Sequence, residues 1–161
     1  MDTSTLYDTL RKSPLTANLD DTQCRVLAGI AGERRLKGDE VLIEEGHTEH
    51  AFHVIIDGML AVTRDCGGGE WTTLAILRVG DLAGELGFVT GRPHSATLRA
   101  VGDTTVYSFE REKLEGLLGQ YPWVVYRLMQ TIVQAVHQIL RRMNAQYVEM
   151  SNYITKQHGR Y

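Results

Sequence analysis

The sequence predicts a mainly β protein with added helices: an antiparallel jelly-roll β-barrel with N-terminal helices and one long C-terminal helix. Short β-branched runs separated by glycines fill the middle of the chain, helical patterns flank them, and an apolar stripe of helical spacing follows. The length of 161 residues fits one domain with a sizeable core.

The opening of the chain indicates two short helices, which together form a helical cap over residues 1–33. Asp20 and Asp21 supply a capping signal for the second helix, whose apolar face contains Val26, Leu27 and Ile30. We expect this cap to cover one end of the barrel.

Residues 34–121 carry the strand signals of the barrel. The runs are β-branched or apolar and are broken by glycines, and we expect strands at 41–43, 52–56, 59–64, 71–77, 97–101 and 104–109. The three glycines at 67–69 favour a hairpin between two of these runs, because glycine adopts the positive φ values that tight hairpins require. This number of short strands suits a barrel or a double-sheet jelly roll.

Helical patterns return after Phe109. A short helix is expected at 110–118, Gly119 stops it, and Pro122 suits the first turn of a long helix over 122–155, which leaves 156–161 as a tail. A helix that ends near residue 153 is about 45 Å long at 1.5 Å per residue, which exceeds the face of a small barrel.

Apolar residues on this helix step by four and three, which is heptad spacing. They form one stripe, made of Val125, Met129, Ile132, Val136, Ile139, Met143 and Met150. A stripe of this kind predicts a parallel homodimer through the C-terminal helix. The alternative is that the whole stripe packs on its own barrel.

Composition excludes several classes of function. A net charge of −3 offers no general attraction for nucleic acid phosphates, so no direct DNA binding is expected. Cys24 and Cys66 lack metal or disulfide spacing, and neither an export signal nor a membrane span is apparent, so a cytoplasmic protein with no membrane contact is expected. No set of residues suggests a catalytic nucleophile and base, and the chain is not expected to be an enzyme.

Three histidines lie close together in the sequence and form a candidate metal site. His47, His50 and His53 lie near three glutamates, and imidazole with carboxylate ligands suits zinc or nickel. The first belongs to a turn and the last to a strand, so the three need not converge. No metal is predicted.

A carboxylate flanked by glycines is the first sequence feature that indicates a ligand-binding site. Glycines at 84 and 87 permit close approach of backbone N–H groups to a phosphate, and Glu85 between them can accept hydrogen bonds from a sugar hydroxyl. Taken alone the pattern is weak, because any turn contains glycine and most glutamates are merely solvated.

Several motifs spaced along the chain strengthen the interpretation of Glu85 as part of a binding site. They are Gly38 with residues 41–43 and Glu45-Gly46, the run from Phe52 to Gly58, Gly80-Asp81, Gly84-Glu85-Leu86, and residues 92–97. In this order they resemble the cyclic-nucleotide-binding domain family, specifically the catabolite activator type of effector domain without the DNA-binding domain. The resemblance covers most of the chain.

The resemblance implies a phosphate-binding cassette over residues 84–97 and no other cofactor. Glu85 would meet the ribose 2′-hydroxyl, and the backbone of the cassette with Ser95 would face a cyclic phosphate. The implied ligand-binding residues are Gly84, Glu85, Leu86, Gly87, Arg92, His94, Ser95, Ala96 and Thr97. The implied ligand is cyclic AMP, cyclic GMP or a cyclic dinucleotide.

The chain departs from the family pattern in two regions. His94 stands where the family usually places an arginine, so the bidentate fork for the phosphate is absent. A histidine titrates near ~6.5, so affinity is expected to weaken at alkaline pH. Ile139 and Leu140 occupy the region from which the catabolite activator type offers hydroxyls to the adenine.

The expected function is a regulatory, signal-transducing sensor or adaptor that acts as a homodimer. The chain stops soon after Tyr153 and leaves no room for a helix-turn-helix, so the expected output is to an unidentified protein effector such as a kinase or transporter. One alternative is a degenerate barrel that has lost the nucleotide and serves as a protein-interaction scaffold. Another is a cupin-like metalloenzyme, because small enzymes also use jelly-roll barrels.

Overall fold

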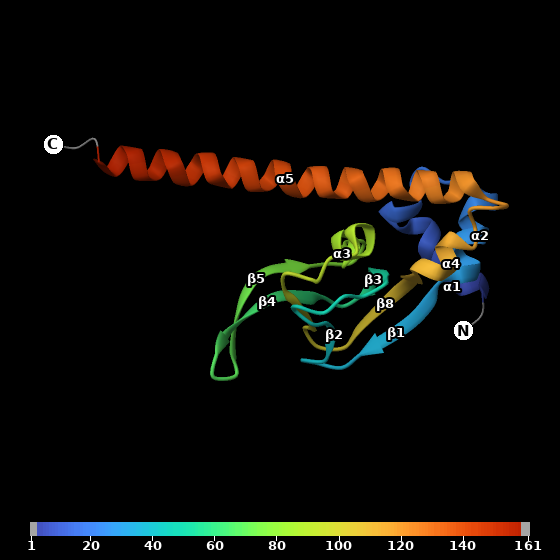
Figure 1. Cartoon of the computed structure of the whole chain (residues 1–161), viewed down its shortest axis with the longest axis horizontal. Coiled ribbons are helices and arrows are strands. Elements are labelled where there is room, and N and C mark those ends of the chain that lie inside the picture. The colour runs from blue at the N-terminus through green and yellow to red at the C-terminus, as the bar shows by residue number, and fades with distance from the viewer. Residues whose placement is uncertain (1–2, 159–161) are drawn as a thin grey trace.

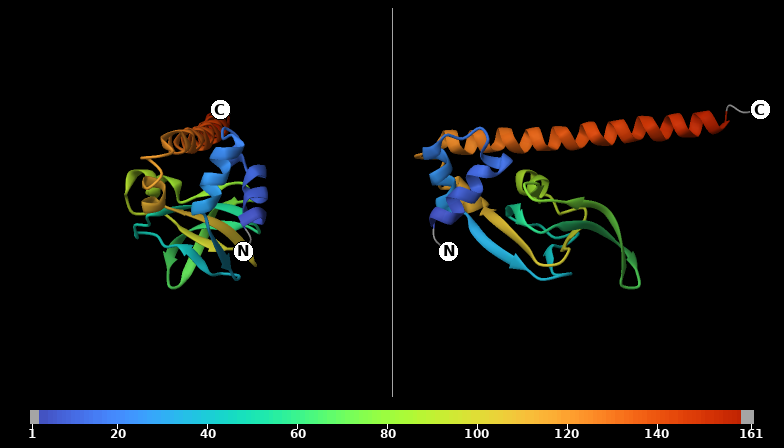
Figure 2. Two further views of the ribbon diagram at one scale, coloured as in Figure 1. Left: turned by 90° about the vertical axis from the view of Figure 1, so that its right-hand side faces the viewer. Right: turned by 180° about the vertical axis from the view of Figure 1, so that it is seen from behind.

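The computed structural model describes residues 3–158 and contains two four-stranded antiparallel sheets, a helical cap and one long helix (Figure 1). The two sheets form the jelly roll that the sequence predicts. The cap lies at one end of the barrel, and the long helix runs over the cap and continues past the barrel, as Figure 1 and the right-hand view of Figure 2 show.

The cap consists of α1 (Thr3–Lys12), η1 (Pro14–Thr16) and α2 (Asp21–Ile30). The predicted cap signal is confirmed as a capping box: the Asp20 carboxylate accepts from the Gln23 backbone N–H at 2.8 Å, and the Gln23 side chain accepts from the Asp20 N–H at 3.1 Å. Two N–H groups that a helix start leaves unpaired are thereby satisfied.

The first sheet has the order β1-β8-β3-β6, formed by β1 (Gly32–Leu36), β8 (Thr104–Glu110), β3 (Ala51–Asp57) and β6 (Leu82–Ala83). β1 is absent from the sequence prediction and begins inside the predicted cap. Its residues Glu33, Arg34 and Arg35 give no apolar alternation, because β1 is an edge strand with a largely exposed face. Charged residues are common on edge strands, where they oppose pairing with other chains.

The second sheet has the order β2-β7-β4-β5, formed by β2 (Val41–Ile43), β7 (Thr97–Ala100), β4 (Leu60–Gly67) and β5 (Glu70–Leu77). The predicted hairpin at the three glycines is confirmed, and all three have positive φ. β5 is exposed along most of its length.

Two clusters of buried side chains form the core. One lies between the sheets and includes Leu36, Ile55 and Val106. The other joins the cap to the barrel and to the start of the long helix, with Leu27 and Phe52 among its members. The cap is therefore packed into the same core as the barrel.

The C-terminal elements are α4 (Arg111–Glu115) and α5 (Pro122–His158). α4 is shorter than the predicted helix at 110–118. α5 continues through 156–158, which were predicted as tail, because no glycine or proline ends the helix there; residues 159–161 of that tail lie outside the described residues. No helix within residues 3–158 combines the length and apolarity that a membrane span requires.

Candidate functional site

The candidate site is the predicted cassette at residues 84–97, which links the two sheets. It starts where β6 ends, continues through α3 (Glu85–Thr90) and returns along an irregular loop to β7. Gly84 and Gly91 flank α3 with φ values of 77° and 69°, a region that glycine adopts without steric cost. α3 lies on the side of the barrel that faces α5 (Figures 1 and 2).

Glu85 is the buried carboxylate of the cassette. The residue is 7% exposed, and no cation pairs with it among the residues that the structure describes. Burial raises the pKa of Glu85, and a backbone hydrogen bond at the residue itself partly opposes this rise. A buried carboxylate without a cation is suited to accept hydrogen bonds from a neutral hydroxyl.

His94 lies against the same helix. Its Nε2 atom is buried and has no hydrogen-bond partner among the described residues. The ring is so close to Gly87 that a Cβ there would lie 2.4 Å from the His94 Cε1. Burial lowers the pKa of His94, which favours the neutral imidazole.

The remaining predicted ligand residues differ in their surroundings. Thr97 is buried, and its hydroxyl accepts from the Glu45 N–H at 3.0 Å, so this side chain is already part of the barrel. Ser95 and Leu86 are exposed, while Ala96 is half-buried. Arg92 is exposed, and no partner is recorded for its guanidinium within residues 3–158. In the structure, therefore, Glu85 belongs to α3 and the His94 ring lies against the same helix, whereas Arg92 is at the surface.

Sequence reasoning missed a buried polar group beside the cassette. His53 is 2% exposed; its Nδ1 lies 2.7 Å from the Ser108 hydroxyl and its Nε2 lies 3.3 Å from a Glu49 carboxylate oxygen. Burial by itself raises the pKa of Glu49, but the hydrogen bond and charge of His53, with Arg34 and His94, lower it overall. Only the pairing of β3 with β8 brings His53 to Ser108, so no local sequence signal indicates the contact.

The histidines of the candidate metal site do not converge in the structure. His47 is exposed beside Glu44, whereas His53 points into the barrel. No group of three or more histidine, cysteine or acidic side chains is placed to hold a metal ion among the described residues.

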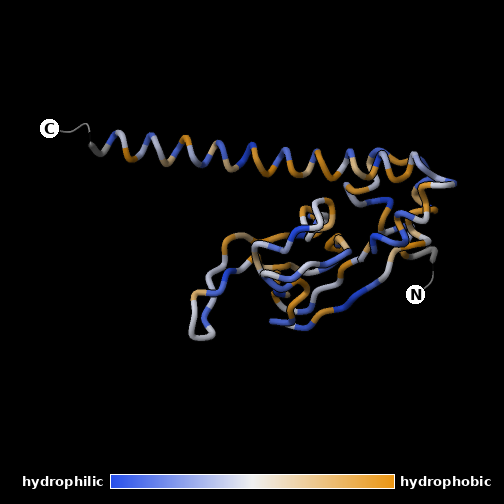
Figure 3. The backbone as a smooth tube through the Cα atoms, in the orientation of Figure 1, coloured by the Kyte–Doolittle hydropathy of each residue, from blue (hydrophilic) through white to orange (hydrophobic). Residues whose placement is uncertain are grey.

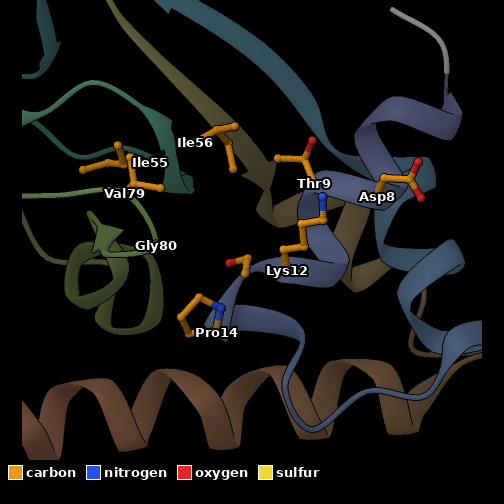
Figure 4. A pocket seen from close by; sticks show the side chains of 9 residues that line it. Asp8, Thr9, Lys12, Pro14, Ile55, Ile56, Val79 and Gly80 are labelled. Carbon is orange, nitrogen blue, oxygen red and sulfur yellow. The ribbon is translucent and has the colours of Figure 1, made fainter.

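A cavity of about 550 Å³ lies elsewhere, between α1 and the barrel (Figure 4). Its walls include Lys12, Pro14, Ile56, Val79 and Gly80, and no cassette residue lines it. Its charged residues are solvent-exposed, whereas the cassette holds a buried carboxylate and a buried ring nitrogen. The cassette is therefore the stronger candidate site.

The predicted stripe on α5 divides into two parts. Ile132 is 2% exposed and packs with Val124 and Leu128 into the core shared with the cap, so it is not available to a partner helix. Met129 is partly buried against the same core, and Val125 and Val136 are half-buried. The first turns of α5 are therefore held by their own chain, as in the alternative that the sequence left open.

Ile139, Met143 and Met150 of the predicted stripe are exposed, and a second set of apolar residues at heptad spacing lies beside the stripe. Five residues recur at intervals of seven, and each is more than half exposed: Tyr126, Val133, Leu140, Tyr147 and Ile154. Met129, Val136, Met143 and Met150 of the predicted stripe lie three positions after the first four of these. Hydrophobic segments, coloured orange, recur between hydrophilic ones along α5 in Figure 3.

The chain belongs to the cyclic nucleotide-binding domain family, because the sequence profile of that domain matches residues 33–121, more than half of the chain. It is 26% identical over 128 residues to a cAMP-dependent protein kinase regulatory subunit from Dictyostelium discoideum, which covers 78% of this chain. It is 26% identical over 106 residues to lysophospholipase NTE1 from Coccidioides immitis, which covers 66%. The chain spans only 39% and 7% of the lengths of these two relatives.

Solved structures share the fold. A cyclic nucleotide-binding domain from Methylobacillus flagellatus superposes with a TM-score of 0.78 at 20% identity, covering 92% of this chain and 83% of that one. The Thermus thermophilus catabolite activator protein superposes with a TM-score of 0.71 at 23% identity, and the match covers 86% of this chain and 63% of that one. The regulatory subunit of a cAMP-independent protein kinase A from Trypanosoma brucei superposes with a TM-score of 0.69 at 18% identity, and the match covers 92% of this chain and 51% of that one.

Proposed function

We propose that this protein is a regulatory sensor or adaptor that binds a cyclic nucleotide in its cassette, acts as a homodimer through α5 and has no catalytic activity of its own. The observation that carries the proposal is the placement of two groups at α3: Glu85, a buried carboxylate without a cation among the described residues, and the partly buried imidazole of His94, which lies against Gly87. Glu85 is suited to accept from a ribose hydroxyl, and His94 to donate to a phosphate oxygen.

Titration calorimetry on the full chain tests the ligand. Cyclic AMP, cyclic GMP and a cyclic dinucleotide are each titrated into the protein and into two variants. We expect heat with at least one of them, loss of that heat in Glu85→Ala, and tighter binding in His94→Arg, because arginine offers a fixed pair of donors to the phosphate. Absence of heat with all three ligands contradicts the sensor proposal.

A second candidate is a degenerate barrel that serves as a protein-interaction scaffold. The observation that favours it is the contact of the His94 ring with the backbone of α3 at Gly87, which occupies part of the cassette. The fold alone does not decide between the two, since the Trypanosoma brucei neighbour is itself described as cAMP-independent. No heat in the calorimetry, with a dimer still present, supports this candidate.

The homodimer is proposed from the exposed heptad positions of α5. An isolated helix in water is marginal, and residues 139–156 of α5 are exposed on every side, so a second helix is needed to cover the apolar residues among them. The proposed seam consists of the five exposed heptad positions together with Met129, Val136, Met143 and Met150. The positions that flank this seam carry no Lys, Arg, Asp or Glu; they are 125, 130, 132, 137, 139, 144, 146, 151 and 153. Two parallel copies in register therefore meet no like charges beside the seam.

Sedimentation velocity at micromolar concentration tests the dimer. Leu140 is 53% exposed and lies in the seam, whereas Gln138 lies on the opposite side of the helix. We expect the wild type and Gln138→Asp to sediment as dimers and Leu140→Asp as a monomer. A monomeric wild type contradicts the proposal.

Signal output is proposed to reach a separate protein effector, since the Dictyostelium relative is a regulatory subunit of a kinase. Lysophospholipase activity is not carried over, because the match spans 7% of that relative's length. Affinity purification with and without the bound nucleotide, using Leu140→Asp as a parallel sample, identifies partners that depend on ligand or on the dimer.

A further inference from the structure

The imidazole of His94 lies against α3, and the backbone of His94 is fixed by two hydrogen bonds. The His94 N–H donates to the His47 carbonyl at 2.9 Å, and the His94 carbonyl accepts from the Gly46 N–H at 2.8 Å. A Cβ at Gly87 would lie 2.4 Å from Cε1 and 2.8 Å from each ring nitrogen. Glycine at position 87 therefore provides the space in which the ring sits.

The ring in this position has an unused polar atom. Nε2 is buried and lacks a partner among the described residues, so the neutral ring leaves a hydrogen-bonding group unsatisfied. Burial lowers the pKa of His94 and disfavours the charged ring in the absence of an anion. An anion beside Nε2 would supply both the missing partner and the compensating charge.

Two titratable groups act on the ring: Glu49 from the loop before β3 and His53 from β3. Glu85 lies on α3 two residues before Gly87, and Arg92 lies two residues before His94 and is exposed. Glu49 raises the pKa of His94, whereas His53 lowers it. The Glu49 carboxylate is shared with His53, whose Nε2 lies 3.3 Å away, so its field only partly offsets the burial of His94.

We propose that His94 takes up a proton when the cassette binds the phosphate of a cyclic nucleotide, so that affinity for the ligand rises as the pH falls. This inference rests on the proposed function and specifies its regulation. A phosphate beside the ring stabilises the imidazolium, so the bound state holds one more proton than the free state between the two histidine pKa values. In that interval affinity changes by up to about tenfold per pH unit, and it is constant above and below it.

Titration calorimetry of the full chain with cyclic AMP and cyclic GMP tests the proton uptake. It is carried out between about pH 5.5 and about pH 8.5, which brackets the usual histidine pKa of about 6.5. At each pH, two buffers of different ionisation enthalpy give the number of protons taken up. We expect affinity to fall with rising pH and uptake to approach one proton in the interval where it falls.

Three variants assign the proton. His94→Gln keeps a neutral donor that does not titrate, and His94→Arg stays charged, so both are expected to bind with an affinity independent of pH. His50→Gln removes an exposed histidine outside the cassette and is expected to keep the wild-type slope. Persistence of the slope in His94→Gln overturns the assignment to His94.

The two proposals fail in different ways. Equal affinity at every pH with no proton uptake overturns the coupling and leaves nucleotide binding in place. Absence of binding at every pH, in the wild type and in His94→Arg, overturns the proposed function and the coupling with it.

Discussion

The guanidinium of Arg111 donates a hydrogen bond to the backbone carbonyl of Phe88 and lies 5.3 Å from the centroid of the Phe88 ring. Phe88 belongs to α3, and Arg111 is the first residue of α4. The Phe88 ring also meets Phe52 edge-to-face at 5.1 Å. One side chain therefore ties the cassette to the segment that leads into α5, while the aromatic core holds it from the other side.

Replacing Arg111 tests this tie. Arg111→Ala removes the donor to the Phe88 carbonyl, and we expect a loss of about 1–3 kcal/mol in the free energy of unfolding, measured by urea denaturation. Amide exchange at Phe88 and Gly91 should become faster, because the end of α3 loses its anchor. Lys113→Ala breaks only the exposed ion pair with Glu110 and should cost less than about 1 kcal/mol. Equal effects of the two substitutions would show that Arg111 acts as an ordinary surface cation.

Phe88 and Leu86 lie on α3 but differ in burial, so replacing each of them distinguishes a core side chain from an exposed one. Phe88 is 6% exposed and Leu86 is 54% exposed. Phe88→Ala should lower the free energy of unfolding by about 3–5 kcal/mol through loss of buried area and the cavity that remains. Leu86→Ala should change it by less than about 0.5 kcal/mol. Thermal or urea unfolding measures both, and a large effect of Leu86→Ala would place that side chain in an interface.

Glu85 should reduce stability at neutral pH. Burial raises the pKa of Glu85 in the folded state, so the folded protein holds the proton that the unfolded chain releases, and stability falls as the pH rises through the folded pKa. Glu85→Gln should therefore be more stable than the wild type at pH about 7, and the difference should close below the usual carboxyl pKa of about 4.3. Urea titrations at both pH values check this. A glutamine variant that is less stable at neutral pH would mean that an unseen donor satisfies the carboxylate.

Gly58 should tolerate no side chain. Its φ is 82°, and a Cβ there would lie 2.5 Å from the Asp103 carbonyl oxygen, a backbone atom that cannot move aside. Gly68 at the hairpin tip has φ 67° and no atom within 4 Å of such a Cβ. Gly68→Ala should therefore cost only the conformational strain of about 1–2 kcal/mol, and Gly58→Ala more than that. Similar losses in the two unfolding curves would contradict the clash at Gly58.

The sequence by itself determined the features that depend on neighbours along the chain. The capping signal at Asp20 and the hairpin at the three glycines are local patterns, and the structure confirms them. The expected strands also follow in the expected order, but β1 and β6 are additional strands that the local patterns did not predict. The cassette is also local, because Gly84, Glu85 and His94 lie within one short segment. The resemblance to the family was strong because its motifs follow one another in a definite order.

Only the tertiary structure decided which atoms meet across the chain. Strand pairing places His53 against Ser108, and chain folding places the His94 ring on Gly87. Periodicity predicted an apolar stripe on α5, but it could not show that the cap covers Ile132 while Leu140 stays exposed. Spacing along a helix defines its faces, whereas burial depends on which distant segment packs against each face.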